Sequence, residues 1–161
     1  MKVQERGREV WKEGMSEKSS LEWYARKDEP RSECFYDGSR SGELLFKART
    51  QSLEVNSRTY RWENDGDKTC KMCDSGRDET IEHVLLECEK YERERRSMIE
   101  DVKEEIGSEL WESMVQEGEG INPTRVVLFL LGLSTEDEWN STTVERVKAF
   151  LESMWTERSH R

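Results

Sequence analysis

Four potential metal ligands fall within a short stretch of this sequence. Two residues separate Cys70 from Cys73, and four separate His83 from Cys88. Structural zinc sites take four thiolate or imidazole ligands at the corners of a tetrahedron, and they bring these ligands in short-range pairs. A two-residue gap allows a tight turn to aim both sulfurs at one point, and an i, i+5 pair fits around a helix end. The spacing therefore predicts one structural Zn²⁺ bound by Cys70, Cys73, His83 and Cys88.

Two other interpretations of these residues stay open. A Cys-x2-Cys pair serves as a redox dithiol in some proteins, but it then starts a helix after a strand, and neither is indicated here. His83 could also be an ordinary helix residue, and Cys88 a small buried apolar side chain. If zinc is bound, four protein ligands leave no open coordination position, so the metal would contribute folding energy and no catalysis.

The apolar content of the chain is low, so a bound metal ion would help to stabilise its fold. Hydrophobic residues make up 33% of the 161 residues and charged residues 39%, which is little apolar material for a globular domain of this size. No signal peptide is recognisable, and the longest apolar run, 126–131, is too short to span a bilayer. We expect an intracellular protein, nuclear or cytoplasmic, without membrane contact and with reduced cysteines.

Helical periodicity dominates the rest of the sequence and predicts a mainly α-helical fold with at most a short β-hairpin. A turn or hairpin is expected at 33–41, where aromatic residues flank Asp37-Gly38. Ser41, Thr80 and Asn122 are the predicted helix N-caps. The predicted helices are 3–15, 42–53, 80–106, a short one around 110–114, a buried one over 123–131 that is apolar on all sides, and 141–157, with a further cap at Ser134 or Thr135.

The chain divides by pattern into three parts that together are expected to form one compact domain. An N-terminal helical arm covers 1–32, a zinc-knuckle region covers 33–100, and a C-terminal helical bundle that packs on it covers 101–161.

The net charge of −10 is unevenly spread along the chain. Residues 1–69 hold 14 basic and 14 acidic residues, and residues 70–161 hold 12 basic and 22 acidic residues. Because an acidic surface repels phosphate, any nucleic-acid contact is expected in the first half or at the knuckle.

The segment CKMCDSGRDETIEHVLLECEKYERER, with LLFKARTQSLEVNSRTYRW before it, resembles the C-terminal zinc-knuckle (CCHC) region of non-LTR, LINE-type (jockey-like) retrotransposon reverse transcriptase polyproteins. Glu79-Thr80, the run His83 to Cys88, Tyr91 and Arg93 to Arg96 match that pattern. The resemblance covers about 18–98. It implies an accessory module that helps to hold template RNA and target DNA near a polymerase active site. No Tyr/Phe-x-Asp-Asp polymerase motif occurs, so the resemblance implies a fragment, a degenerate copy or a host gene derived from one.

Two functional classes follow. The first is a non-catalytic nucleic-acid-binding module, with cations for phosphates and aromatic rings for base stacking. Its candidate residues are Arg49, Arg58, Tyr60, Arg61, Trp62, Lys68, Lys71 and Arg77. Residues such as Tyr60 and Trp62 are, however, more often packing anchors, and lone arginines are usually only solvated. The alternative is a protein-interaction or scaffold module that docks a partner through its acidic C-terminal helices, with zinc purely structural. An enzyme is not expected, because no phosphate-binding Gly-rich loop or nucleophile elbow occurs.

Overall fold

A computed structural model describes residues 2–26, 33–62, 64–133 and 137–158. These residues confirm the mainly α-helical fold: helices and single helical turns make up most of them, and one two-stranded antiparallel sheet joins them. The helices are α1 (Lys2–Ser16), α2 (Arg40–Arg49), α3 (Asn56–Thr59), α4 (Glu92–Ile106), α5 (Ser108–Val115), α6 (Pro123–Leu130) and α7 (Asp137–Arg158). The 3-10 turns are η1 (Ser19–Leu21), η2 (Tyr24–Arg26), η3 (Asn64–Gly66) and η5 (Glu89–Tyr91), and η4 (His83–Glu87) is a π-turn.

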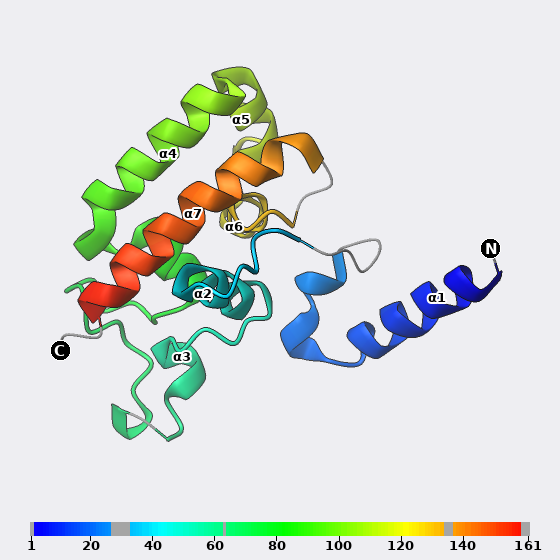
Figure 1. Cartoon of the computed structure of the whole chain (residues 1–161). Coiled ribbons are helices and arrows are strands. Elements are labelled where there is room, and N and C mark those ends of the chain that lie inside the picture. Colours follow the sequence, from blue (N-terminus) through cyan, green and yellow to red (C-terminus); the bar gives the residue numbers. More distant parts are fainter. Residues whose placement is uncertain (1, 27–32, 63, 134–136, 159–161) are drawn as a thin grey trace.

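The core forms around α6 and α7. Asn122 caps α6 as predicted, with its side chain accepting a hydrogen bond from the backbone N–H of Arg125 at 3.2 Å. All residues from Val126 to Leu131 are buried, which confirms the prediction that this segment is enclosed on every side. The long helix α7 lies between α2 and α4, and it packs on both (Figure 1). Its apolar stripe, which includes Val147 and Leu151, is removed from solvent, and such burial is the main stabilising contribution to the fold.

Helix α2 begins two residues earlier than predicted. Ser39, and not Ser41, is the N-cap: its hydroxyl accepts a hydrogen bond from the N–H of Gly42 at 3.0 Å. Asp37 in turn accepts a hydrogen bond from the N–H of Ser39 at 3.0 Å. The helix ends at Arg49, and Gln51 takes a positive φ of 53°, so Leu53 packs into the core from beyond the helix.

The β-hairpin lies elsewhere than expected. Residues 33–39 form turns, whereas β1 (Gln116–Glu117) pairs with β2 (Gly120–Ile121) around Gly118, whose φ is 64°. The predicted cap at Ser134 or Thr135 lies outside the described residues.

Helix α1 projects away from the other helices (Figure 1). Met15 near its end is buried, but Val10 and Val3 are largely exposed. Within the part of the chain that is described, no helix is both long and apolar enough to cross a membrane. Helix α4 crosses residue 100, and residues on both sides of that position belong to one hydrophobic cluster.

Candidate metal centre

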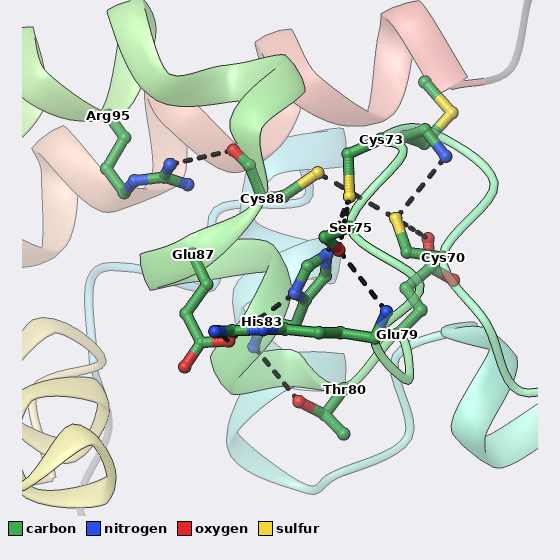
Figure 2. Close-up of polar contacts among 11 residues, drawn as sticks. Cys70, Cys73, Ser75, Glu79, Thr80, His83, Glu87, Cys88 and Arg95 are labelled. Atoms are coloured by element: carbon green, nitrogen blue, oxygen red, sulfur yellow. Dashed lines mark hydrogen bonds and ion pairs between the residues drawn. The ribbon is translucent and has the colours of Figure 1, made fainter.

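The two predicted ligand pairs converge on one point. The ligand atoms of Cys70, Cys73, His83 and Cys88 all lie within 4.8 Å of one another. The sulfurs of Cys70 and Cys88 are 3.9 Å apart, and Nε2 of His83 is 3.4 Å from the sulfur of Cys73 (Figure 2). Tetrahedral coordination with metal–sulfur bonds of about 2.3 Å and metal–nitrogen bonds of about 2.0 Å gives separations of about 3.8 Å and about 3.5 Å. The four side chains therefore have the geometry to hold a metal ion.

A narrow loop positions the first pair. The backbone N–H of Cys70 donates to the carbonyl of Arg77 at 2.9 Å, and that of Glu79 donates to Lys68 at 2.8 Å. Gly76, with a φ of 70°, returns the chain between them, a conformation that favours glycine. Inside the loop, the N–H of Met72 points at the sulfur of Cys70 at 3.4 Å. Such N–H groups stabilise a thiolate, so the loop is suited to hold negative sulfur.

A π-turn positions the second pair. Thr80 caps the turn as predicted, because its hydroxyl accepts a hydrogen bond from the N–H of His83 at 3.0 Å. The N–H of Cys88 then donates to the carbonyl of His83 at 2.7 Å, closing an i, i+5 ring. In an α-helix, five residues rotate by about 140° and would separate the two side chains. The wider turn places both toward one centre. It also ends at Cys88 (φ −59°, ψ 117°), so the predicted continuous helix 80–106 is wrong.

The imidazole of His83 is oriented by its surroundings. Its side chain is buried, with Nε2 toward Cys73 and Nδ1 facing the carboxylate of Glu87 at 3.6 Å (Figure 2). Glu87 forms an ion pair with Arg77 at 2.8 Å. Nδ1 makes no hydrogen bond within the described part of the chain, whereas Nε2 lies 3.4 Å from the sulfur of Cys73. Nε2 is therefore the atom that would face a metal ion.

The three thiols differ in acidity without a metal. Burial acts to raise the pKa of Cys73, but hydrogen bonds from the hydroxyl and backbone of Ser75 and from His83 outweigh it and lower the pKa to about 6. Burial raises the pKa of Cys88 to about 12, and it also raises the pKa of Cys70. At neutral pH one thiolate and two thiols are thus ready to meet a metal ion.

We expect binding of a divalent metal to release two protons at about pH 7.5, one each from Cys70 and Cys88, because only thiolates coordinate. Groups that are protonated in the free chain and deprotonated in the complex make affinity rise with pH. The logarithm of the association constant should therefore increase by about 2 per pH unit there. Calorimetry in buffers of different ionisation enthalpy measures the proton count, and release of no protons would contradict thiolate coordination.

The predicted nucleic-acid-binding residues, Arg49 apart, lie at the surface. Arg58, Arg61, Lys68, Lys71 and Arg77 are exposed, and Tyr60 is half-buried. Trp62 is 69% exposed, so its interpretation as a packing anchor is wrong. Lys71 forms an ion pair with Asp67, and Arg77 pairs with Glu87. Among the described residues, no carboxylate pairs with the remaining three cations, Arg58, Arg61 and Lys68.

Tyr60 is engaged by two of these cations. The ammonium of Lys68 lies 4.4 Å from the centre of its ring, and the guanidinium of Arg61 lies 5.6 Å from it. Nε of Arg61 also donates to the Tyr60 hydroxyl at 3.0 Å. Tyr60 therefore positions cations, and the free aromatic face of this loop belongs to Trp62.

The structure contradicts the prediction that Arg49 contacts phosphate. Its side chain is fully buried. Nε donates to the carbonyl of Leu131 at 2.7 Å, and Nη1 donates to Glu33 at 2.8 Å and to the hydroxyl of Tyr36 at 2.9 Å. Arg49 is a structural residue that joins α2 to the end of α6.

Cys34 lies outside the cluster as an exposed free thiol. His160 lies outside the described residues.

Sequence reasoning missed the polar contacts that surround the cluster. Arg95 is buried and donates from Nη2 to the carbonyl of Cys88 at 2.8 Å. The next residue, Arg96, is exposed and pairs with Glu92 along the helix. Glu79 is also buried, and it pairs with Arg158 at the other end of the sequence. Because Glu and Arg are frequent throughout this chain, nothing in the sequence indicates that Glu79, Arg95 and Arg158 are the ones that lie beside the cluster.

No protein-family model matches this chain, and neither a curated protein nor a solved structure does. The class of protein is therefore defined by the fold and the cluster alone: a small, mainly α-helical protein with a Cys3His cluster that could hold a metal ion.

Proposed function

We propose that the Cys3His cluster binds one structural Zn²⁺. Three thiolates and one imidazole are the donors that zinc prefers in closed tetrahedral sites, whereas Mg²⁺ and Ca²⁺ require oxygen ligands. Two of the separations, 3.9 Å between the sulfurs of Cys70 and Cys88 and 3.4 Å between the sulfur of Cys73 and Nε2 of His83, are close to tetrahedral values and support this choice. When bound, zinc supplies no reaction chemistry and joins the loop of Cys70 and Cys73 to the turn of His83 and Cys88.

We further propose that the protein is a non-catalytic nucleic-acid-binding module, as in the retrotransposon reverse transcriptase tails that its sequence resembles. The observation that carries this proposal is the exposed indole of Trp62, which lies close in the chain to three exposed cations, Arg58 of α3, Arg61 and Lys68. Single-stranded nucleic acids bind to such surfaces by stacking bases on aromatic rings while cations neutralise phosphates. We call the four residues the Trp62 loop.

Backbone contacts attach the Trp62 loop to the metal centre. Asn56, at the start of α3, donates from its side chain to the carbonyl of Thr69 at 2.7 Å and from its backbone to Glu79 at 2.7 Å. Ser57 donates to the carbonyl of Glu79 at 3.1 Å. These bonds join α3 to the residues that flank Cys70. Zinc would therefore fix the surface that meets the nucleic acid, although it would not touch the nucleic acid itself.

A salt titration tests the proposal. Labelled single-stranded RNA and DNA oligonucleotides are mixed with the zinc-loaded chain, and the dissociation constant is measured between about 50 and 200 mM salt. Neutralisation of three phosphates predicts that the logarithm of the association constant falls with the logarithm of the salt concentration with a slope of about −2. If no binding occurs at about 50 mM salt, the nucleic-acid proposal fails and the scaffold alternative, with a protein docked on the acidic helices, is favoured.

We expect Trp62→Ala to weaken binding of a single-stranded oligonucleotide about 5- to 150-fold, because stacking on one aromatic ring contributes about 1–3 kcal/mol per base. Trp62 is 69% exposed and its ring contributes little to the stability of the fold, so the denaturant concentration at the unfolding midpoint should not change. Ile121→Ala is the matched control: this residue is 67% exposed but lies in the β-hairpin. Equal affinity of both variants would remove Trp62 from the interface.

A further inference from the structure

A buried ion pair lies directly behind the candidate metal centre. Glu79 is fully buried, and both terminal nitrogens of Arg158 bind its carboxylate, with Nη2 2.7 Å from Oε2. Oε1 of the same carboxylate lies 3.8 Å from the sulfur of Cys70 (Figure 2). A negative group therefore stands beside one of the sulfurs that would coordinate the metal.

Metal binding changes the electrostatics at this contact. Metals bind cysteine as a thiolate, so in the metal-bound chain two anionic groups would face each other across 3.8 Å. Buried charges of like sign are strongly unfavourable unless a counter-charge is close. A cation held on Glu79 is therefore required for the metal-bound state.

Arg158 is placed to supply that cation. It belongs to the last turn of α7, and its Nη2 also donates to the backbone carbonyl of Glu54 at 3.2 Å. Its guanidinium lies 4.9 Å from the ring centre of Trp155 on the same helix. A planar guanidinium that binds a carboxylate with two nitrogens has a fixed orientation, which a lysine cannot reproduce.

A second arginine borders the centre from another helix. Arg95 of α4 donates to the carbonyl of Cys88, and its Nη1 has no hydrogen-bond partner among the described atoms. Three thiolates, one neutral imidazole and one divalent ion carry a formal charge of −1, so a nearby cation is favourable there as well. Helices α4 and α7 thus each place an arginine beside the candidate metal centre.

We propose that Arg158, acting through Glu79, is a positioning residue of the metal centre, so that metal binding and docking of the last turn of α7 stabilise each other. The inference rests on the proposed metal function of the Cys3His cluster. Because coupling between two sites is reciprocal, metal should hold the end of α7 in place, and loss of that contact should weaken metal binding to the same extent.

The affinity of the full chain for Co²⁺, followed by its thiolate absorption and by competition with a chelator, tests the inference. Arg158→Gln should weaken binding about 10- to 100-fold, the usual effect of removing a group that orients metal ligands. Arg146→Gln is the matched control on the same helix, because Arg146 pairs at the surface with Asp101 and Glu105 of α4. Its affinity should equal that of the parent chain.

The double variant Glu79→Gln with Arg158→Gln separates charge compensation from simple packing. Removing the carboxylate removes the need for the cation, so this variant should regain most of the lost affinity. In the parent chain, Co²⁺ should also slow amide exchange in residues 152–158, and Arg158→Gln should abolish that protection.

Two results would overturn the inference. One is equal Co²⁺ affinity of Arg158→Gln and Arg146→Gln, and the other is a double variant as weak as Arg158→Gln alone. A parent chain that binds no Co²⁺ or Zn²⁺ would instead refute the proposed metal function, so the two failures are distinct.

Discussion

Replacing Cys73 by serine will abolish stoichiometric zinc binding and lower the free energy of unfolding by about 4 kcal/mol or more. A ligand present at 1,000 times its dissociation constant stabilises the folded state by about 4 kcal/mol, and structural zinc is normally held more tightly than that. Cys73 is only partly buried, so exchanging its sulfur for oxygen changes the packing little and removes mainly a ligand.

The measurement is native mass spectrometry for the metal content, combined with denaturant unfolding with and without a chelator. Cys34→Ser is the matched control, because Cys34 is an exposed thiol outside the cluster. It should keep one zinc per chain and the parent stability. If Cys73→Ser unfolds at the same denaturant concentration as the parent, zinc is not a structural element of this fold.

Replacing Arg49 by methionine will destabilise the protein by about 3–5 kcal/mol, the usual cost when one partner of a buried ion pair is removed. The aliphatic volume is largely kept, but the carboxylate of Glu33 and the carbonyl of Leu131 each lose the hydrogen bond that Arg49 donates. These groups are separated in sequence and meet only in the folded chain. The effect is therefore on folding, with no expected change in the salt dependence of nucleic-acid binding.

Lys47→Ala on the same helix is the control for Arg49. Lys47 pairs with Glu43 at the surface at 2.8 Å, and exposed pairs of this kind contribute less than about 1 kcal/mol. Chemical denaturation of both variants decides the matter. A loss below about 1 kcal/mol for Arg49→Met would show that its buried contacts contribute no net stability.

The metal cluster could be predicted from the sequence because each ligand pair is local. Spacing alone brings Cys70 to Cys73, and the chain between Cys73 and His83 is long enough to return. The π-turn could not be predicted, because helical periodicity is interpreted with 3.6 residues per turn, and a single turn of five leaves no repeat to detect. The assumption of 3.6 residues per turn also led to the wrong prediction of one continuous helix over 80–106, across Cys88.

The apolar segment 123–131 was equally predictable, since a helix without a polar face has to be enclosed. The position of the α2 cap was not, because Ser39 and Ser41 both suit a cap, and the hydrogen bonds that Asp37 makes to Ser39 select the first. The predictions for Arg49, expected at the surface, and for Trp62 as a packing anchor were wrong for the same reason. Whether an amphipathic side chain is buried depends on partners such as Leu131, which lie far away in the chain.

The position of the ligands along the chain bears on the order in which this protein is assembled. All four candidate metal ligands lie between residues 70 and 88, whereas the arginine that binds Glu79 is residue 158. Synthesis runs from the N-terminus, so a ribosome completes the ligand set well before it makes α7. We expect metal to enter an open, exchangeable knuckle first and to become slow to leave only when the last helix closes over it.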